Sequence, residues 1–112
     1  MATAKLLILD DNTMVRQMIA ALARELGFSV IEAASVDAAR APLAEGDVDV
    51  LLCDDDLGAG MSGFQFIASD PLQMPAIVVL MSGNPKPNEL SEGIRYLCKP
   101  FTIQQLEVEL LP

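Results

Sequence analysis

Three consecutive aspartates, Asp54, Asp55 and Asp56, stand together in this sequence. They follow an apolar run and precede the glycine-rich stretch LGAGMSG. The chain contains no histidine, which excludes a histidine-ligated zinc site, a Ser-His-Asp triad and a histidine phosphodonor within it. Any chemistry must therefore use carboxylates, hydroxyls and lysine.

Apolar runs predict the strands that would position these side chains. Near-continuous apolar stretches of this length are typical of strands buried on both faces, as in a parallel sheet. Such runs occupy 5–10, 48–54, 76–81 and 94–99, and a weaker, alternating run occupies 28–33.

Helical patterns lie between these runs. The segment 12–27 repeats apolar residues at spacings of three and four and ends at Gly27, a stop signal. A second helix is predicted from the N-cap Ser35 to Gly46, with a kink or an early end at Pro42. The buried face predicted for the first helix consists of Val15, Met18, Ile19, Leu22 and Leu26.

The last third of the chain is less regular. A short helix is predicted over 63–71, ending before the proline of that segment. A helix over 101–111 opens with a capping box from Thr102 to Gln105. The segment 83–93 contains two prolines and two glycines, which leaves room for at most one helical turn.

The alternation of strands and helices predicts one doubly wound α/β domain over residues 1–112, with right-handed crossovers. The length of 112 residues is typical of a single domain. The formal net charge of −9 disfavours nucleic-acid binding, which needs a basic face. We also expect no membrane segment, because no apolar stretch approaches the ~20 residues of a span.

The two cysteines, Cys53 and Cys98, lie far apart in apolar segments. We expect small buried thiols in a reducing, cytoplasmic compartment. The methionines, Met14, Met18 and Met81 among them, are expected to fill gaps in the core.

The residues that follow each predicted strand carry the chemistry. In an open parallel sheet the carboxyl ends of the strands meet at one edge, where ligands bind. The sequence therefore predicts a joint site of acids, a hydroxyl and an ammonium. In strand order its members are Asp10 and Asp11, then Asp54, then Ser82, then Lys99.

These residues resemble those of the receiver domain of two-component response regulators, of the chemotaxis-regulator type. The matching motifs are DD at 10–11, VDVLLCD at 48–54, the downstream MSG, the serine of LMSG, and KPF at 99–101. The resemblance covers essentially the whole chain. It implies a flavodoxin-like fold with a five-stranded parallel sheet in the order 2-1-3-4-5, in which the fourth helix, at 84–93, is abbreviated.

The resemblance implies a signalling domain rather than a metabolic enzyme. Such a domain takes a phosphoryl group from the phosphohistidine of a histidine kinase or a histidine phosphotransfer protein, and later hydrolyses it. Phosphorylation switches a surface that binds a downstream protein target. The cofactor that the resemblance implies is Mg²⁺.

Two aspartates are candidates for the phosphoacceptor. Family members carry an acidic residue five positions before it, and Asp49 stands at that distance from Asp54. Counting back from MSG by the commonest loop length selects Asp55, but LGAGMSG fits a longer loop with an extra glycine. Leu52 and Asp54 share a strand face, and the apolar run stops at Asp54, so we favour Asp54. Gly58 stands where the family usually has proline.

The resemblance assigns a role to each residue of the predicted site. Asp54 is the expected nucleophile, assisted by Lys99 and Ser82, because phosphoryl transfer depends on positioning and charge neutralisation. The expected Mg²⁺ ligands are Asp10, Asp11, Asp54 and the backbone carbonyl of Asp56. The expected phosphoryl-binding groups are Ser82, Lys99 and the backbone N–H groups of Gly83 and Asp55.

Three side chains have further expected roles. Ser82 and Tyr96 form the switch that responds to phosphorylation. The side chain of Asp55 points to solvent or caps the following turn. The side chain of Asp56 lies near the entry of the attacking water.

Each motif also has a purely structural interpretation. Asp10 and Asp11 are suited to capping the following helix, Lys99 to the surface, and Tyr96 to core packing. The acidic stretch resembles an EF-hand loop, but Ala59 and Gln65 replace the glycine and glutamate that such a loop requires. A solvated acidic turn is the remaining structural alternative.

Two alternative functions remain open. A pseudo-receiver would dock partners without being phosphorylated, which Gly58 and the weak 84–93 segment favour. A haloacid-dehalogenase-type phosphatase combines an aspartate nucleophile with a serine, a lysine and an acidic pair. In that family the acidic pair comes last, whereas here it comes first.

Overall fold

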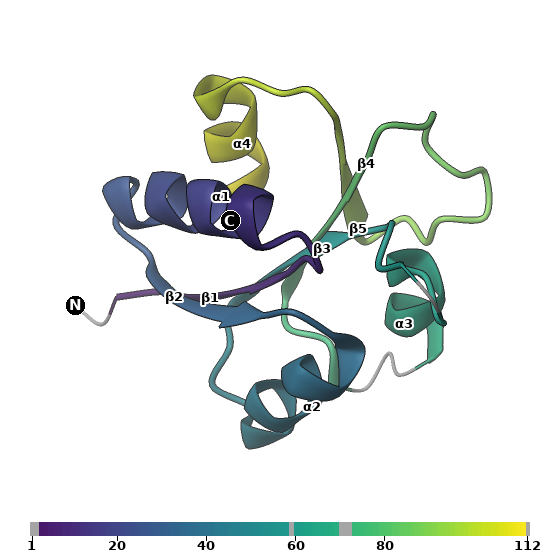
Figure 1. The fold of residues 1–112 in the computed structure, drawn as a ribbon, viewed down its shortest axis with the longest axis horizontal. Helices are drawn as coiled ribbons and strands as arrows, with labels where there is room; N and C mark the ends of the chain where they lie inside the picture. The colour runs from purple at the N-terminus through teal and green to yellow at the C-terminus, as the bar shows by residue number, and fades with distance from the viewer. Residues whose placement is uncertain (1–2, 59, 70–72, 112) are drawn as a thin grey trace.

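The computed structural model of the chain describes residues 3–58, 60–69 and 73–111. Its strands form one parallel sheet in the order β2-β1-β3-β4-β5 (Figure 1), which confirms the predicted class and order. The strands are β1 (Lys5–Leu9), β2 (Ser29–Ala33), β3 (Val50–Asp54), β4 (Ile77–Ser82) and β5 (Ile94–Cys98). The helices are α1 (Thr13–Glu25), α2 (Val36–Glu45), α3 (Gly63–Ser69) and α4 (Ile103–Leu110).

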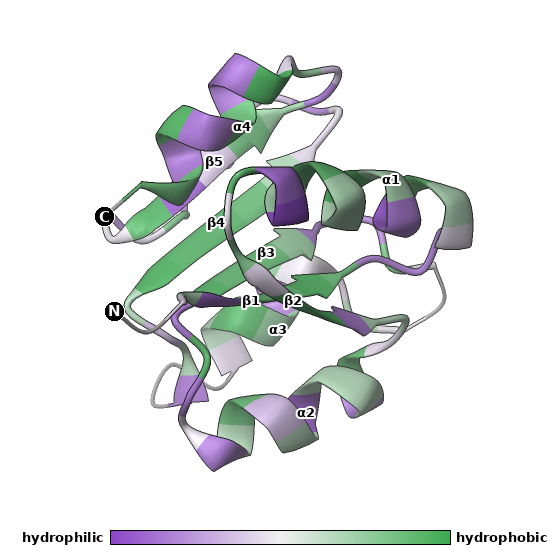
Figure 2. Cartoon of the chain, turned by 90° about the vertical axis from the view of Figure 1, so that its left-hand side faces the viewer, coloured by the Kyte–Doolittle hydropathy of each residue, from purple (hydrophilic) through white to green (hydrophobic). Residues whose placement is uncertain are grey.

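Helices cover both faces of the sheet. α1 and α4 lie on one face, and α2 and α3 lie on the other (Figure 1). Alternate residues of β1 enter the two layers, because Leu7 and Leu9 pack with α2 and α3, whereas Leu6 and Ile8 pack with α1 and α4. Burial on both faces explains the unbroken apolar character of β3 and β4 (Figure 2).

The strand register aligns the ends that carry the acids. β1 and β3 stay paired up to Leu9 and Cys53. Asp10 and Asp54 follow directly, so they leave neighbouring strands at the same level. On the other side of β3, Asp54 pairs with Met81 of β4.

Side-chain caps begin each of the four described helices; at α3, Oγ of Ser62 accepts a hydrogen bond from the N–H of Gln65 at 3.1 Å. Asn12 Oδ1 accepts a hydrogen bond from the N–H of Val15 at 3.0 Å, which caps α1. Ser35 caps α2, and Thr102 with Gln105 forms the capping box of α4, both as predicted. Because Asn12 provides the cap of α1, the aspartates at 10 and 11 are not needed for that role.

Three helix predictions compare with the structure in different ways. At Pro42 we expected a kink or an early end; α2 continues through Pro42 to Glu45, so the early end does not occur. In the described residues 73–111, no helix forms between β4 and β5; only turns interrupt the loop 83–93. α3 ends at Ser69, and the predicted boundary at Pro71 lies outside the described residues.

Several side chains predicted to be buried are exposed. Met14 and Met18 on α1 are 81% and 58% exposed, so the prediction that they fill the core is wrong, whereas Met81 is fully buried. Cys53 is buried, as predicted, but Cys98 is exposed on β5. Among the described helices, none is long and apolar enough to cross a membrane.

Candidate functional site

A cleft of about 650 Å³ opens at the carboxyl edge of the sheet. Its walls come from the ends of β1, β3, β4 and β5, as the parallel arrangement predicts. The structure thus brings together all the predicted site residues except Tyr96. The lining residues are Asp10, Asp11, Asn12, Val15, Asp54, Asp55, Asp56, Ser82, Gly83, Asn84 and Lys99.

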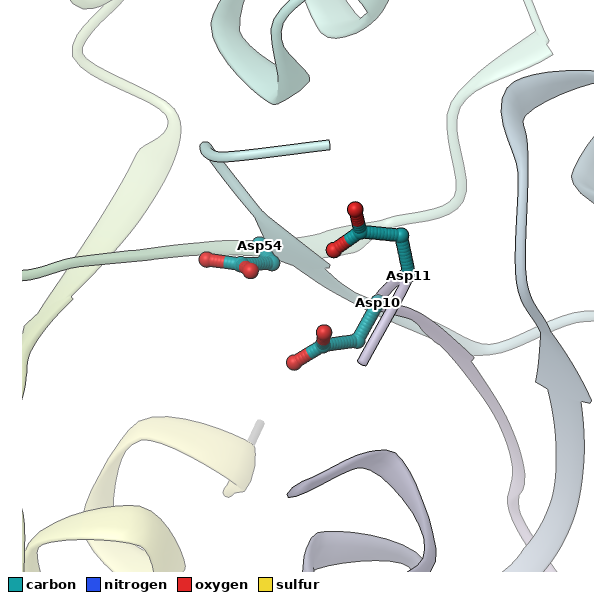
Figure 3. A group of neighbouring side chains, drawn as sticks. All are labelled: Asp10, Asp11 and Asp54. Atoms are coloured by element: carbon teal, nitrogen blue, oxygen red, sulfur yellow. The ribbon is translucent and has the colours of Figure 1, made fainter. Parts of the chain in front are cut away.

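Three carboxylates form the acidic part of this cleft. One oxygen from each of Asp10, Asp11 and Asp54 lies within 4.8 Å of the others. Figure 3 shows Asp10 and Asp11 at the end of β1, beside Asp54 at the end of β3. Like charges this close repel one another, so the arrangement favours a bound cation.

Asp10 is the most deeply buried of the three. It is fully buried, and its Oδ1 accepts a hydrogen bond from the N–H of Asn12 at 2.9 Å. Its Oδ2 has no hydrogen-bond partner among the described residues. Burial raises the pKa of Asp10 above its ordinary value, and the negative charge of Asp54 adds to this effect.

The unpaired Oδ2 of Asp10 indicates whether the three carboxylates are suited to a metal ion. A buried carboxylate oxygen without a partner is costly. Mg²⁺ prefers a few carboxylate oxygens together with water and phosphate oxygens. The orphaned Oδ2 of Asp10, next to the carboxylates of Asp11 and Asp54, therefore fits such an ion.

Lys99 neutralises part of this charge. Its Nζ lies 2.9 Å from Oδ1 of Asp54, and the Asp54 side chain is almost fully buried. The backbone N–H of Lys99 donates to the carbonyl of Ser82 at 2.8 Å, which holds the end of β5 against β4. The Lys99–Pro100 peptide bond is cis. The ammonium of Lys99 and the carboxylate of Asp54 are thus in direct contact.

Ser82 presents its hydroxyl to the cleft at the end of β4. It is 6% exposed, and its Oγ accepts a hydrogen bond from the N–H of Asn84 at 3.0 Å. Because the oxygen is used as an acceptor, the hydroxyl proton remains available to donate. The sequence interpretation overlooked Asn84, which also lines the cleft.

Asp55 has a structural role that corrects one expectation. Its backbone N–H donates to the carbonyl of Met81 at 2.8 Å, so in this structure it is not available to a phosphoryl oxygen. Its Oδ1 accepts from the N–H of Phe64 at 3.0 Å, at the start of α3. Capping, one of the two alternatives for this side chain, is therefore what the structure has.

Asp56 and Gly58 shape the loop beside Asp11. Oδ1 of Asp56 accepts from the N–H of Gly58 at 3.1 Å. Gly58 has a φ of +76°, which proline cannot adopt. A Cβ at this position would lie 2.9 Å from Oδ2 of Asp11. These two features explain why glycine replaces proline here.

Gly63 has a role that the motif alone does not explain. A Cβ built on Gly63 would lie 2.2 Å from the carbonyl oxygen of Asp54 and 2.9 Å from Sγ of Cys53. α3 therefore begins in direct contact with the backbone of Asp54. The MSG motif contained this glycine, but its close approach depends on tertiary packing.

Tyr96 lies outside the cleft. It is half-buried on β5 against the layer that contains α2 and α3. Its hydroxyl donates to the backbone carbonyl of Asn84. Since Asn84 in turn donates to Ser82, the two predicted switch residues are connected through the start of the loop 83–93.

Known proteins resemble this chain in sequence or in fold. It is 30% identical over 111 residues to a probable transcriptional regulator, ycf29, of Cyanophora paradoxa, covering 92% of this chain and 52% of that protein. It is 31% identical over 112 residues to the hydrogenase transcriptional regulatory protein HoxA of Cupriavidus necator, covering 92% of this chain and 22% of HoxA. The chain therefore spans about half of the first relative and about a fifth of the second.

A solved structure has the same fold as this chain. The chemotaxis protein CheY4 of Vibrio cholerae matches with a TM-score of 0.84 and 27% identity over 97% of each chain. The sequence model of the response regulator receiver domain matches residues 6–110, from β1 to the end of α4. With the acids, the serine and the lysine at the expected strand ends, this chain belongs to the response regulator receiver domain family.

Proposed function

We propose that this chain accepts a phosphoryl group on Asp54 in a Mg²⁺-dependent step of two-component signalling. The donor is the phosphohistidine of a histidine kinase or of a histidine phosphotransfer protein. The observation that carries the proposal is the environment of Asp54, which touches Lys99 and shares one cleft with Asp10, Asp11 and Ser82.

In the proposed reaction, an oxygen of Asp54 attacks the phosphorus and the P–N bond of the phosphohistidine breaks. The electron pair of that bond leaves with the imidazole, and an acyl phosphate forms on Asp54. Lys99 transfers its contact from the Asp54 carboxylate to a phosphoryl oxygen. The hydroxyl of Ser82 and the N–H of Gly83 donate to the other oxygens, which spreads the developing charge.

Mg²⁺ would supply charge neutralisation for the transferred group. Asp10, Asp11, Asp54 and the carbonyl of Asp56 would hold it. Hydrolysis of the acyl phosphate by water would return the domain to its starting state. Asp56, which lines the cleft, would lie near the path of this water.

The proposed output follows the contacts beyond Ser82. A phosphoryl group that draws Ser82 toward it displaces the N–H of Asn84 from the serine oxygen. Asn84 carries the carbonyl that Tyr96 contacts, so the loop 83–93 and β5 respond together. A ligand shifts such an equilibrium only through its different affinity for the two states, and the phosphoryl group supplies that difference. A downstream protein would read this surface.

Intact mass spectrometry after incubation with Mg²⁺ and acetyl phosphate tests the proposal. We expect a labile adduct of about 80 Da, the mass of one HPO₃ on an activated carboxylate. Asp54→Asn should abolish it, whereas Asp55→Asn, a matched change in the adjacent residue, should keep it. An adduct that persists in Asp54→Asn would contradict the assignment of the acceptor. No adduct with any donor would leave a docking role without phosphorylation.

A further inference from the structure

We infer that Arg16 is a positioning residue for the cation site, because its guanidinium fixes the main chain of Asp10. This inference rests on the proposed role of Asp10 as a Mg²⁺ ligand. Arg16 lies in the first turns of α1, with its backbone N–H bonded to the carbonyl of Asn12 at 2.9 Å. From there the side chain returns to the end of β1.

The contacts of Arg16 connect three elements. Nη1 donates to the backbone carbonyl of Asp10 at 2.9 Å. Nε donates to Oε1 of Glu32 on β2 at 3.2 Å. The side chain of Arg16 is only 12% exposed, so the guanidinium is held in one place between β1 and β2.

Asp10 needs this donor because it lies one residue beyond the end of β1. Its backbone N–H still reaches the carbonyl of Ala33 at 3.1 Å, but its carbonyl is bonded by the Arg16 side chain instead of by a neighbouring strand. With Oδ1 bonded to Asn12, Oδ2 is the atom of Asp10 left to meet a cation. By holding the carbonyl of Asp10, Arg16 therefore helps to fix the direction in which Oδ2 of Asp10 points.

If Arg16 acted through its charge alone, its removal would tighten cation binding. A positive guanidinium near three carboxylates weakens cation binding, so its loss should tighten binding if charge were its main contribution. Its ion pair with Glu32 offsets part of this repulsion. Positioning predicts weaker binding when Arg16 is lost, and the two interpretations therefore differ in sign.

Arg24 provides a matched control. It lies on the same helix and pairs with the same glutamate, since Nη2 of Arg24 lies 3.5 Å from Oε2 of Glu32. Among the hydrogen bonds of the described residues, Arg24 makes none to Asp10. Arg16→Met and Arg24→Met remove the same charge, and methionine keeps part of the apolar stem.

Isothermal titration with MgCl₂ measures the effect, at a temperature where circular dichroism shows every variant to be folded. We expect Arg16→Met to bind Mg²⁺ about 10-fold more weakly than the unchanged chain, as for other residues that orient metal ligands. Arg24→Met should bind as tightly as the unchanged chain or more tightly. Arg16→Lys keeps the charge but cannot bridge Asp10 and Glu32, so it should also bind more weakly.

Labelling with acetyl phosphate over a range of Mg²⁺ concentrations gives a second measurement. The half-saturating Mg²⁺ concentration should rise in Arg16→Met, while the rate at saturating Mg²⁺ should stay close to that of the unchanged chain. Equal Mg²⁺ affinities in Arg16→Met and Arg24→Met would overturn the inference and leave the proposed function intact. An unchanged chain that binds no Mg²⁺ would overturn both.

Discussion

The α-carbon of Gly63 faces the carbonyl of Asp54 so closely that a Cβ would lie 2.2 Å from its oxygen. Gly63→Ala must therefore push α3 away from β3. Alanine favours helix more than glycine does, so a loss of stability would come from this contact. We expect the free energy of unfolding to fall by about 3 kcal/mol, the range of strongly overpacked positions.

Urea denaturation measures this loss. Gly93→Ala is the matched control, because a Cβ at Gly93 meets no atom within 4 Å in the described part of the chain. The control should lie within about 0.5 kcal/mol of the unchanged chain. Equal midpoints for the two variants would show that α3 adjusts without cost.

Gly58→Ala should weaken Mg²⁺ binding. The added methyl group would lie 2.9 Å from Oδ2 of Asp11, so the carboxylate must move from its place in the acidic cluster. Gly60→Ala carries the same backbone strain, with a φ of +98°, but its Cβ meets nothing within 4 Å among the described atoms. Calorimetric titration should show about 10-fold weaker binding for Gly58→Ala alone. Equally weakened Mg²⁺ binding in Gly58→Ala and Gly60→Ala would assign the effect to backbone strain instead of to the contact with Asp11.

Lys99→Met should slow the phosphorylation of Asp54 while the domain remains folded. The variant removes the cation that lies 2.9 Å from Oδ1 of Asp54, the proposed acceptor, and would meet the phosphoryl group. Loss of one such group typically lowers a rate about 100-fold. The time course of the acetyl phosphate adduct measures the rate, and Lys86→Met, a change on the exposed loop, is the control. An unchanged rate would exclude Lys99 from the reaction.

The stability of the metal-free domain should depend on the protonation of Asp10. Burial raises the pKa of this residue above its ordinary value of 3.8. The favourable contribution of protonated Asp10 is fully present below the unfolded pKa and is lost as the pH rises through the higher folded pKa. At neutral pH the ionised, buried carboxylate therefore destabilises the metal-free fold.

Asp10→Asn should accordingly raise the metal-free free energy of unfolding at neutral pH by about 1 kcal/mol. The gain should shrink below about pH 4, where aspartate is protonated in both states. Urea denaturation at several pH values measures it, and Mg²⁺ should reverse the order by stabilising only the unchanged chain. Asp11→Asn, which removes an exposed carboxylate of the same cluster, should gain less. A gain that is independent of pH would contradict the explanation.

The sheet and most of the cleft could be predicted because their signals are local. Strands buried on both faces leave unbroken apolar runs, and the residues after each run reach one edge. The spacing of Asp49 and Asp54 also has a physical basis, because Oδ2 of Asp49 accepts from the N–H of Lys5 at 2.8 Å. That bond joins β1 and β3 at the end opposite the acids.

The features that were missed depend on contacts between distant segments. Met18 stands at helical spacing from Leu22, yet Met18 is exposed, because the buried face of α1 is centred on Ile19 and Ala23. The N–H of Asp55 was expected to be free, but the pairing of β3 with β4 engages it with Met81. Neither outcome can be deduced from the residue pattern of a single segment.

The loop 83–93 has one final consequence. Apart from Leu90, which is buried in the core, and Asn84, which joins Ser82 to Tyr96, most of its positions are exposed and belong to no helix. Substitutions at the exposed positions should therefore be tolerated without compensating changes in the sheet. Under the proposed function, the surface that a downstream protein would recognise can therefore change while the acidic cleft stays the same.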